Sequence, residues 1–394
     1  MNLQVSQRAT SIKPSPTLTV TARAAQLRAQ GRDIISLGAG EPDFDTPGHI
    51  KKAAMEAIEA GLTKYTAVGG TPELKQAIRN KFKRENGLEY NAEQILASCG
   101  CKHSLYNLMQ ALLNPGDEMI IPAPYWVSYP AMAHLAGAEP VIIDAGIDQG
   151  FKINGQQLRE AITARTRLII INSPSNPTGA CYGEAELAEL AEILLDHPDI
   201  IIATDDIYEH ILWGKETFRN ILNVCPDLYE RTVVFNGVSK AYAMTGWRIG
   251  YVGGPVSLVR AMQKIQSHST SNPASIAQAA AQAALDGEQS YITKSTAIFK
   301  ERHDYVYKRL NAMQGVKCSA SAGTFYSFPN VEDIIKRQAD IGNDVEFAEY
   351  LLEEAGVALV PGSAFGAPGY VRLSFATSME NLEKAMDRLE QTLK

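Results

Sequence analysis

One lysine stands at an unusual place in a weakly charged stretch, residues 232–251. Lys240 follows the apolar run Val233–Phe235, which is typical of a buried strand, after an Asn-Gly break. A charged lysine at the end of a buried strand is costly unless it is paired. A Schiff base with an aldehyde cofactor is one way to remove that cost, and a solvated loop lysine is the simpler alternative.

The neighbours of this lysine could bind an anionic group. Ser239 precedes it and Arg248 follows eight residues later. A guanidinium matches phosphate with a planar fork of donors, so the three residues together could hold a phosphorylated cofactor. The alternative for Arg248 is a surface ion pair.

Two adjacent carboxylates end another apolar run. Asp205 and Asp206 follow Ile201–Thr204, and Tyr208 comes three residues after Asp205. Acidic groups at the end of a buried strand need a partner. A protonated pyridine nitrogen is such a partner, and a charged ring nitrogen makes the ring an electron sink.

Polar residues after other apolar runs could complete a site. Ser98–His103 opens a predicted helix, where free amides of Gly100, Cys101 and Lys102 could form an anion cup, or an ordinary turn. Trp126 could stack on a flat ring or fill the core. Arg372, in the middle of a predicted strand, either pairs with a carboxylate or faces water.

The elements that must position these residues follow a regular pattern. Short apolar runs alternate with helical stretches, and predict a mostly parallel seven-stranded sheet covered by helices on both faces, an α/β fold. Ligands of such sheets gather beyond the carboxyl ends of the strands. The predicted strands are 94–97, 118–121, 141–143, 168–171, 200–203, 233–235 and 249–252.

The two ends of the chain show a different pattern of predicted secondary structure. Two prolines make 13–16 unsuitable for regular helix, and a helix is predicted over 19–30. After residue 290 strands and helices mix as in an α+β domain. We therefore expect a large domain over 46–290, and a small domain made of 1–45 and 291–394.

Composition excludes several classes of protein. A net charge of −7 does not favour nucleic acid or an anionic membrane as a partner, and 45% hydrophobic residues are ordinary for a globular protein. No apolar run reaches membrane-spanning length. Five cysteines favour reduced thiols in a cytoplasm, and because Cys99 and Cys101 lack a second pair at zinc spacing, we expect no metal site.

The block S-K-A-Y-A-M-T-G-W-R-I-G-Y at 239–251 resembles the cofactor-lysine segment of class I aminotransferases, the fold type I pyridoxal-phosphate enzymes. G-A-G-E-P-D-F at 38–44 and N-P-T-G at 176–179 extend the resemblance over nearly the whole chain. It implies pyridoxal 5'-phosphate as cofactor and a homodimer, in which Tyr65 reaches the partner's cofactor phosphate.

The resemblance also implies a role for each candidate residue. Lys240 is the catalytic residue, and forms the Schiff base. Gly40 and Arg372 bind the substrate α-carboxylate, the latter with a two-pronged contact. The cofactor contacts are Asp205 at the ring nitrogen, Asn176 and Tyr208 at the phenolic oxygen, Trp126 on the ring, and Ser239, Arg248 and Gly100–Lys102 at the phosphate.

Within the class, the chain most resembles bacterial aspartate aminotransferases of the gamma subgroup. The segments that carry this likeness are S-C-G-C-K-H at 98–103 and P-Y-W-V-S-Y-P at 124–130. It implies amino transfer from L-aspartate to 2-oxoglutarate, with Lys102, Ser15 and Thr17 at the side-chain carboxylate. Two residues depart from the family: Cys101 replaces a frequent glycine, and Gly237 a phosphate-binding serine of distant relatives.

Several alternatives remain at this level. The amino donor could be an aromatic amino acid or alanine, and the acceptor could be prephenate. A carbon–sulfur lyase could use the same cofactor. Two other classes of protein are less favoured. Aminotransferase-like modules of transcription regulators carry an added basic DNA-binding domain. Dinucleotide dehydrogenases need a G-x-G-x-x-G motif, which this chain lacks in the required context.

Overall fold

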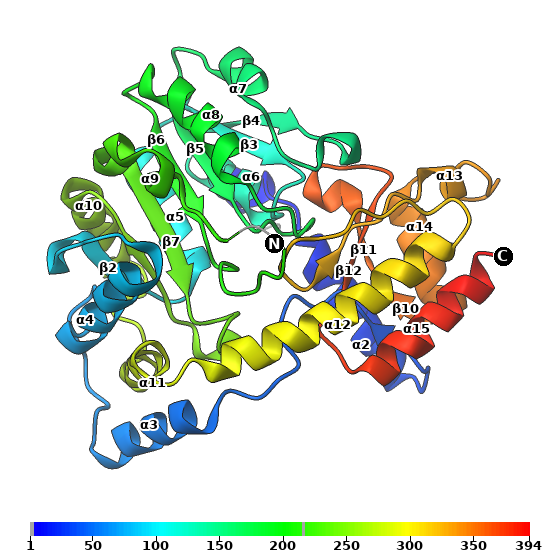
Figure 1. Cartoon of the computed structure of the whole chain (residues 1–394), viewed down its shortest axis with the longest axis horizontal. Helices are drawn as coiled ribbons and strands as arrows, with labels where there is room; N and C mark the ends of the chain where they lie inside the picture. The colour runs from blue at the N-terminus through cyan, green and yellow to red at the C-terminus, as the bar shows by residue number, and fades with distance from the viewer. Residues whose placement is uncertain (1–3, 215–216) are drawn as a thin grey trace.

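The computed structural model describes residues 4–214 and 217–394, which form two parts joined by a long helix (Figure 1). The larger part is built around a seven-stranded sheet, and the smaller part contains short strands and the C-terminal helices. Helix α12 (Ser290–Ala312) runs from the side of α11 to the side of α14, so that it spans both parts.

The large sheet confirms the predicted α/β architecture. Its strand order is β2-β8-β7-β6-β5-β3-β4, and all neighbours are parallel except that β8 runs antiparallel to both β2 and β7. All seven predicted strands are present, with bounds that shift by a few residues. They are β2 (Ile95–Ser98), β3 (Glu118–Ala123), β4 (Glu139–Asp144), β5 (Thr166–Asn172), β6 (Ile201–Asp205), β7 (Thr232–Gly237) and β8 (Gly250–Gly253).

Helices cover both faces of this sheet, as the apolar strands predict. Along β5, Ile169 and Ile171 belong to one apolar cluster, whereas Leu168 and Ile170 belong to another on the opposite face. Because successive side chains of a strand point to opposite faces, a strand that is apolar throughout needs cover on both sides. The helices of this part are α3 (Gly48–Glu59), α4 (Pro72–Lys81), α5 (Cys101–Leu112), α6 (Ser128–Leu135), α7 (Gly155–Ala161), α8 (Glu184–Leu195), α9 (Ile221–Val224), α10 (Val256–Ser267) and α11 (Ser275–Asp286).

The smaller part draws on both ends of the chain. Strand β1 (Ile35–Ser36) pairs in parallel with β10 (Val357–Ala358), which is more than 300 residues away in the sequence. A second sheet has the order β11-β12-β9 and places Arg372 on its central strand. The remaining elements are β9 (Tyr326–Ser327), β11 (Val360–Pro361), β12 (Val371–Ser374), α1 (Gln7–Thr10), α2 (Pro16–Ala29), α13 (Glu332–Ile335), α14 (Asp344–Tyr350) and α15 (Met379–Thr392).

Helix α2 corrects one prediction from the sequence. The helix was expected from residue 19, yet it begins at Pro16, with Ser15 as its N-cap. Proline is compatible with the first turn of a helix, because its missing N–H would have no helical partner there. Among residues 4–214 and 217–394, none of the helices combines the length and apolar character needed to cross a membrane.

Candidate active site

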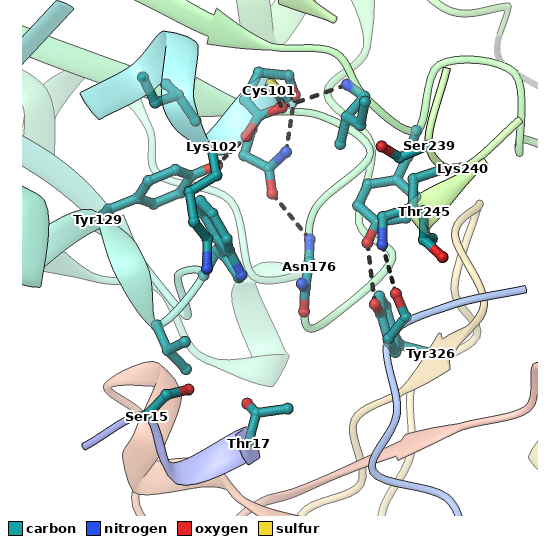
Figure 2. Close-up of a pocket in the computed structure, with 18 of the residues that line it drawn as sticks. Ser15, Thr17, Cys101, Lys102, Tyr129, Asn176, Ser239, Lys240, Thr245 and Tyr326 are labelled. Carbon is teal, nitrogen blue, oxygen red and sulfur yellow. Dashed lines mark hydrogen bonds between the residues drawn. The ribbon is translucent and has the colours of Figure 1, made fainter. Parts of the chain in front are cut away.

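A cavity of about 290 Å³ lies beyond the carboxyl ends of the central strands, between the two parts of the fold. Its wall combines residues that follow β5, β6 and β7 with the start of α5, the start of α2 and strand β12. Figure 2 shows Lys102 and Tyr129 on one side, Lys240 and Tyr326 on the other, and Asn176 between them. The predicted candidates that line it are Ser15, Thr17, Gly40, Cys101, Lys102, Trp126, Asn176, Asp205, Tyr208, Ser239, Lys240, Arg248 and Arg372.

Lys240 sits in the loop after β7, and its amine points into the cavity (Figure 2). Its Nζ donates a hydrogen bond to the carbonyl oxygen of Gly40 at 2.5 Å. Burial, together with the nearby positive charge of Arg372, lowers the pKa of Lys240 to about 8. A larger share of this amine is therefore neutral, and able to act as a nucleophile or base, than in an exposed lysine.

Asp205 ends β6 with a buried carboxylate that lines the same cavity. Its Oδ2 accepts a hydrogen bond from Tyr129 Oη at 2.6 Å. Asp206, the neighbour predicted to be structural, faces elsewhere and accepts from Asn220 Nδ2 at 2.6 Å. Of the two adjacent acids, Asp205 is thus the one that the fold presents to a ligand.

Arg372 joins the smaller part of the fold to the cavity. Its Nη1 donates to Asn176 Oδ1 at 2.9 Å and its Nη2 to the Gly38 carbonyl at 2.7 Å. Its guanidinium carbon lies 4.4 Å from the centre of the Tyr326 ring. The buried Nε has no hydrogen-bond partner among the described residues, so a donor of this arginine remains to be satisfied.

Tyr326 links two of the predicted residues. Its hydroxyl lies 3.0 Å from the hydroxyl of Tyr208, and a side chain at Gly40 would collide with it at 2.7 Å. Glycine at position 40 therefore lets the loop pass close to Tyr326. The same close approach brings the Gly40 carbonyl within reach of Lys240.

The start of α5 forms a cradle with Arg248. Gly100 adopts φ +90°, and a Cβ there would lie 2.2 Å from Arg248 Nη2. Arg248 itself has φ 56°, which is uncommon for a residue with a side chain, and its Nη1 donates to the Thr245 carbonyl at 2.9 Å. The helix N-terminus and the guanidinium thus meet with no side chain between them, an arrangement that suits a phosphate.

A second cationic group stands at another side of the cavity. The Lys102 ammonium lies 4.8 Å from the centre of the Trp126 ring, and burial lowers its pKa. Ser15 and Thr17 line the cavity from the start of α2 (Figure 2). The Ser15 hydroxyl makes no capping bond to its own helix in the described structure, so it can serve a ligand.

Two of the predicted residues, Tyr65 and Gly100, are not among those that line the cavity, although Gly100 packs against Arg248, which does. Tyr65 is 92% exposed and does not line the cavity of its own chain. Gly237, where a serine would bind phosphate in distant relatives, has Ile249 O at 3.0 Å from the position of a Cβ, so a side chain would be crowded there.

Sequence reasoning missed several residues of the cavity wall, above all Tyr129 and Tyr326. Tyr129 lies in the first turn of α6, within a segment that the sequence analysis used only for the family resemblance. Tyr326 lies in β9, in a run of aromatic residues typical of a core strand. A buried tyrosine usually finds a hydrogen-bond partner, which is the signal that could have marked both.

The site fits the cofactor implied by the resemblance. Pyridoxal phosphate carries an aldehyde, a basic ring nitrogen and a phosphate. The cavity offers an amine with a lowered pKa at Lys240, a buried carboxylate at Asp205 and the Gly100–Arg248 cradle, which a Cβ would fill. These three groups correspond one to one to the three functional groups of the cofactor.

Comparison with known proteins gives a consistent result. The family described as aminotransferase class I and II matches residues 32–389. An aspartate/prephenate aminotransferase of Nitrosomonas europaea is 58% identical, over 99% of this chain and 100% of that protein. The crystal structure of the Rhizobium meliloti aspartate aminotransferase has a TM-score of 0.96 and 47% identity, covering 100% of this chain and 99% of that one. The Thermus thermophilus aspartate aminotransferase with maleate has a TM-score of 0.92 and 43% identity, covering 99% and 100%.

Proposed function

The chain belongs to the class I and II aminotransferases, and we propose that its amino donor is L-aspartate and its acceptor 2-oxoglutarate. The enzyme is a pyridoxal-phosphate-dependent transaminase. The observation that carries the proposed specificity is the pair of cationic side chains, Lys102 and Arg372, in the wall of one cavity. Two cations suit a substrate with two carboxylates.

When bound, pyridoxal phosphate supplies an aldehyde that condenses with amines and a ring that withdraws electrons from the substrate α-carbon. In our proposal Arg248, Ser239 and the backbone of Gly100–Lys102 hold the phosphate. Asp205 holds the ring nitrogen in its charged form, and Trp126 packs on the ring. Asn176 and Tyr208 bind the phenolic oxygen.

Lys240 is the proposed catalytic residue. Its lowered pKa keeps a fraction of Nζ free of a proton near neutral pH, so the amine can take the proton of the substrate α-carbon. The same Nζ, once protonated, can then give the proton to the carbon of the cofactor that carried the aldehyde oxygen. Gly40 and Arg372 bind the α-carboxylate and hold the substrate for this transfer.

The second carboxylate of the substrate is assigned to Lys102, with the hydroxyls of Ser15 and Thr17. The related enzyme from Thermus thermophilus was solved with maleate, which is a dicarboxylate. This supports a dicarboxylate as ligand of the cavity described above. Because aspartate, glutamate and their oxo acids all carry two carboxylates, one set of residues can serve both halves of the reaction.

The variant Lys102→Ala tests the specificity. The loss of a hydrogen bond to a charged group, about 1.5–3 kcal/mol, should raise KM for aspartate about ten- to hundredfold and leave alanine nearly unchanged. Lys308→Ala, a change at an exposed lysine on α12, is the matched control. Equal changes for aspartate and alanine would instead favour an alanine or aromatic aminotransferase.

Prephenate is a second candidate acceptor. Two relatives, 58% and 54% identical, are named aspartate/prephenate aminotransferases. Leu18 lines the cavity next to Thr17 and is 69% exposed, which offers apolar surface to a ring-bearing acid. Assays with either oxo acid as the sole acceptor decide between the two. A carbon–sulfur lyase would release pyruvate and ammonia with no acceptor present.

We further propose a homodimer with shared active sites. Tyr65, with 92% of its surface exposed, has no role in its own cavity, and in the proposal it contacts the cofactor phosphate of the partner. A fully active monomer in light scattering would contradict this role. We also propose that the protein is located in the cytoplasm, because its cysteine count is low.

A further inference from the structure

The carboxylate of Asp205 is surrounded by hydrogen-bond donors of the protein itself. Tyr129 Oη lies 2.6 Å from Oδ2, whereas the backbone N–H of Ile207 lies 3.4 Å from Oδ1. The thiol of Cys101 lies 3.8 Å from the same Oδ1. These donors come from three places in the fold, namely α6, the loop after β6 and the first residue of α5.

The two side-chain donors keep their protons. Burial raises the pKa of Tyr129 well above its usual range, and the charge of Asp205 raises it further. The same two causes raise the pKa of the Cys101 thiol. Tyr129 is 2% exposed and its ring packs edge-on to Trp126 at 5.3 Å, so its hydroxyl is fixed in place.

We propose that Tyr129 and Cys101 are positioning residues that act through Asp205, holding its carboxylate ionised and oriented toward the ring nitrogen of the cofactor. The inference rests on the role proposed above for Asp205. Neither side chain needs to touch the substrate. Their contribution is to stabilise the charged form of an acid that the fold has removed from water.

The balance at Asp205 shows why donors are needed. Burial raises the pKa of Asp205, whereas the hydrogen bonds from Tyr129, Ile207 and Cys101 and the charge of Lys240 lower it. The other titratable groups in interaction with it are Asp206 and Tyr208. Without the Tyr129 hydroxyl, Asp205 would bind a proton at a higher pH and lose its attraction for a charged ring nitrogen.

The contact between Cys101 and Asp205 explains why this chain can have a cysteine where the family frequently has a glycine. A Cβ at Gly250 would lie 2.1 Å from the backbone nitrogen of Cys101, so the start of α5 packs directly on β8. The backbone at position 101 can therefore belong to the anion cup while the side chain turns to Asp205. A glycine there would keep the cup and lose one weak donor.

The test measures the dissociation constant of pyridoxal phosphate for the full-length protein between about pH 5.5 and 8.5, because burial raises the pKa of the Asp205 carboxyl above its usual range. The ratio of the Tyr129→Phe constant to the wild-type constant cancels the pH dependence that both share through Lys240 and the phosphate. The lost hydrogen bond to a charged group predicts a ratio of about ten to a hundred at the acid end, falling toward alkaline pH.

A double-mutant cycle with Asp205→Asn shows whether Tyr129 acts through this acid. In the Asp205→Asn background, Tyr129→Phe should change the dissociation constant by no more than about twofold. Tyr182→Phe is the matched control, because Tyr182 is also buried and accepts a hydrogen bond from Ile153 N at 3.0 Å. It should leave the pH profile of cofactor binding unchanged.

The thiol is tested separately. Cys101→Ala should raise the dissociation constant by a smaller factor than Tyr129→Phe, and Cys101→Ser, which retains a donor, should recover part of the loss. An alanine variant identical to wild type over the whole pH range would remove Cys101 from the proposal.

The outcomes separate this inference from the proposed function. A ratio for Tyr129→Phe that is constant with pH, or an equal effect in the Asp205→Asn background, would show a packing role and overturn the inference alone. Unchanged cofactor binding in Asp205→Asn itself would overturn the role proposed for Asp205.

Discussion

Arg372 Nη1 donates a hydrogen bond to Asn176 Oδ1 at 2.9 Å, across 196 residues of sequence and from one part of the fold to the other. Nη2 is held by the Gly38 carbonyl at 2.7 Å, and the ring of Tyr326 lies beneath the guanidinium. The arginine is therefore oriented before any substrate arrives. Such preorganisation reduces the entropy lost on binding.

Arg372→Lys tests this arrangement. Lysine keeps the charge and loses the planar fork of donors, so KM for L-aspartate should rise about tenfold to hundredfold, with a smaller change in kcat. Steady-state kinetics at fixed acceptor concentration measure both. Arg309→Lys, in an outer ion pair with Asp387 and Glu390, should leave both constants near wild type. An unchanged KM in Arg372→Lys would contradict the proposed carboxylate contact.

Tyr326 should contribute through its ring rather than through its hydroxyl. Tyr326→Phe removes the 3.0 Å contact to Tyr208 but keeps the ring 4.4 Å from the Arg372 guanidinium. We expect KM for aspartate within about twofold of wild type in this variant. Tyr326→Leu loses the cation–π contact, about 0.5–2 kcal/mol, and should raise KM about three- to thirtyfold. Equal effects of the two variants would assign the contribution to the hydroxyl instead.

The lowered pKa of Lys240, about 8, predicts the pH dependence of cofactor uptake. Only the neutral amine attacks an aldehyde, so the rate of uptake by the apoprotein should rise as pH increases toward 8 and level off above it. Stopped-flow absorbance after mixing with pyridoxal phosphate gives this profile. A rate still rising near pH 10, as for an ordinary lysine of pKa about 10.4, would contradict the assignment.

A buried ion pair behind the site makes a prediction about stability. Lys81 and Glu209 are hydrogen bonded, with side chains 0% and 3% exposed, and Glu209 Oε1 also accepts from Asn236 Nδ2 at 2.7 Å. Lys81→Met leaves a buried carboxylate without its cation and should lower the free energy of unfolding by about 3–5 kcal/mol at pH 7. Urea denaturation of the apoprotein measures the difference.

The same pair predicts how that loss changes with pH. Burial alone would raise the pKa of Glu209, but Lys81 and His210 lower it below its usual value. The stability from the ionised carboxylate is thus present above the unfolded pKa, about 4.3, and is lost as pH falls through the folded value. In Lys81→Met the acid can bind a proton, so the difference from wild type should shrink toward pH 4.5. Lys83→Met, at a lysine 68% exposed, is the control and should stay within about 0.5 kcal/mol.

The sequence was sufficient to locate the residues that follow the central strands. Asp205 ends β6, while Asn176 and Lys240 lie in the loops after β5 and β7, and the parallel order of these strands brings the three residues to one edge of the sheet. Apolar runs mark such strands because both faces are covered. The position of these residues at one edge of the sheet can therefore be predicted from local sequence patterns alone.

Residues whose partners are distant in sequence could not be predicted in this way. Tyr129 is 76 residues from Asp205, and Tyr326 is 118 residues from Tyr208. Their hydrogen bonds arise only when α6 and β9 pack against the end of β6. The predicted start of α2 is wrong for a local reason: two prolines in 13–16 argue against regular helix, yet Pro16 suits the first helical position.

The most direct test of the account is the visible absorption spectrum of the purified enzyme with pyridoxal phosphate, before and after L-aspartate is added without an oxo acid. We expect a visible band that disappears with aspartate, with about one oxaloacetate formed per site, and that returns on addition of 2-oxoglutarate. Lys240→Ala should lack this response. A wild-type band that persists with aspartate but disappears with alanine or tyrosine would contradict the proposed substrate, and the same response in Lys240→Ala would contradict the catalytic lysine.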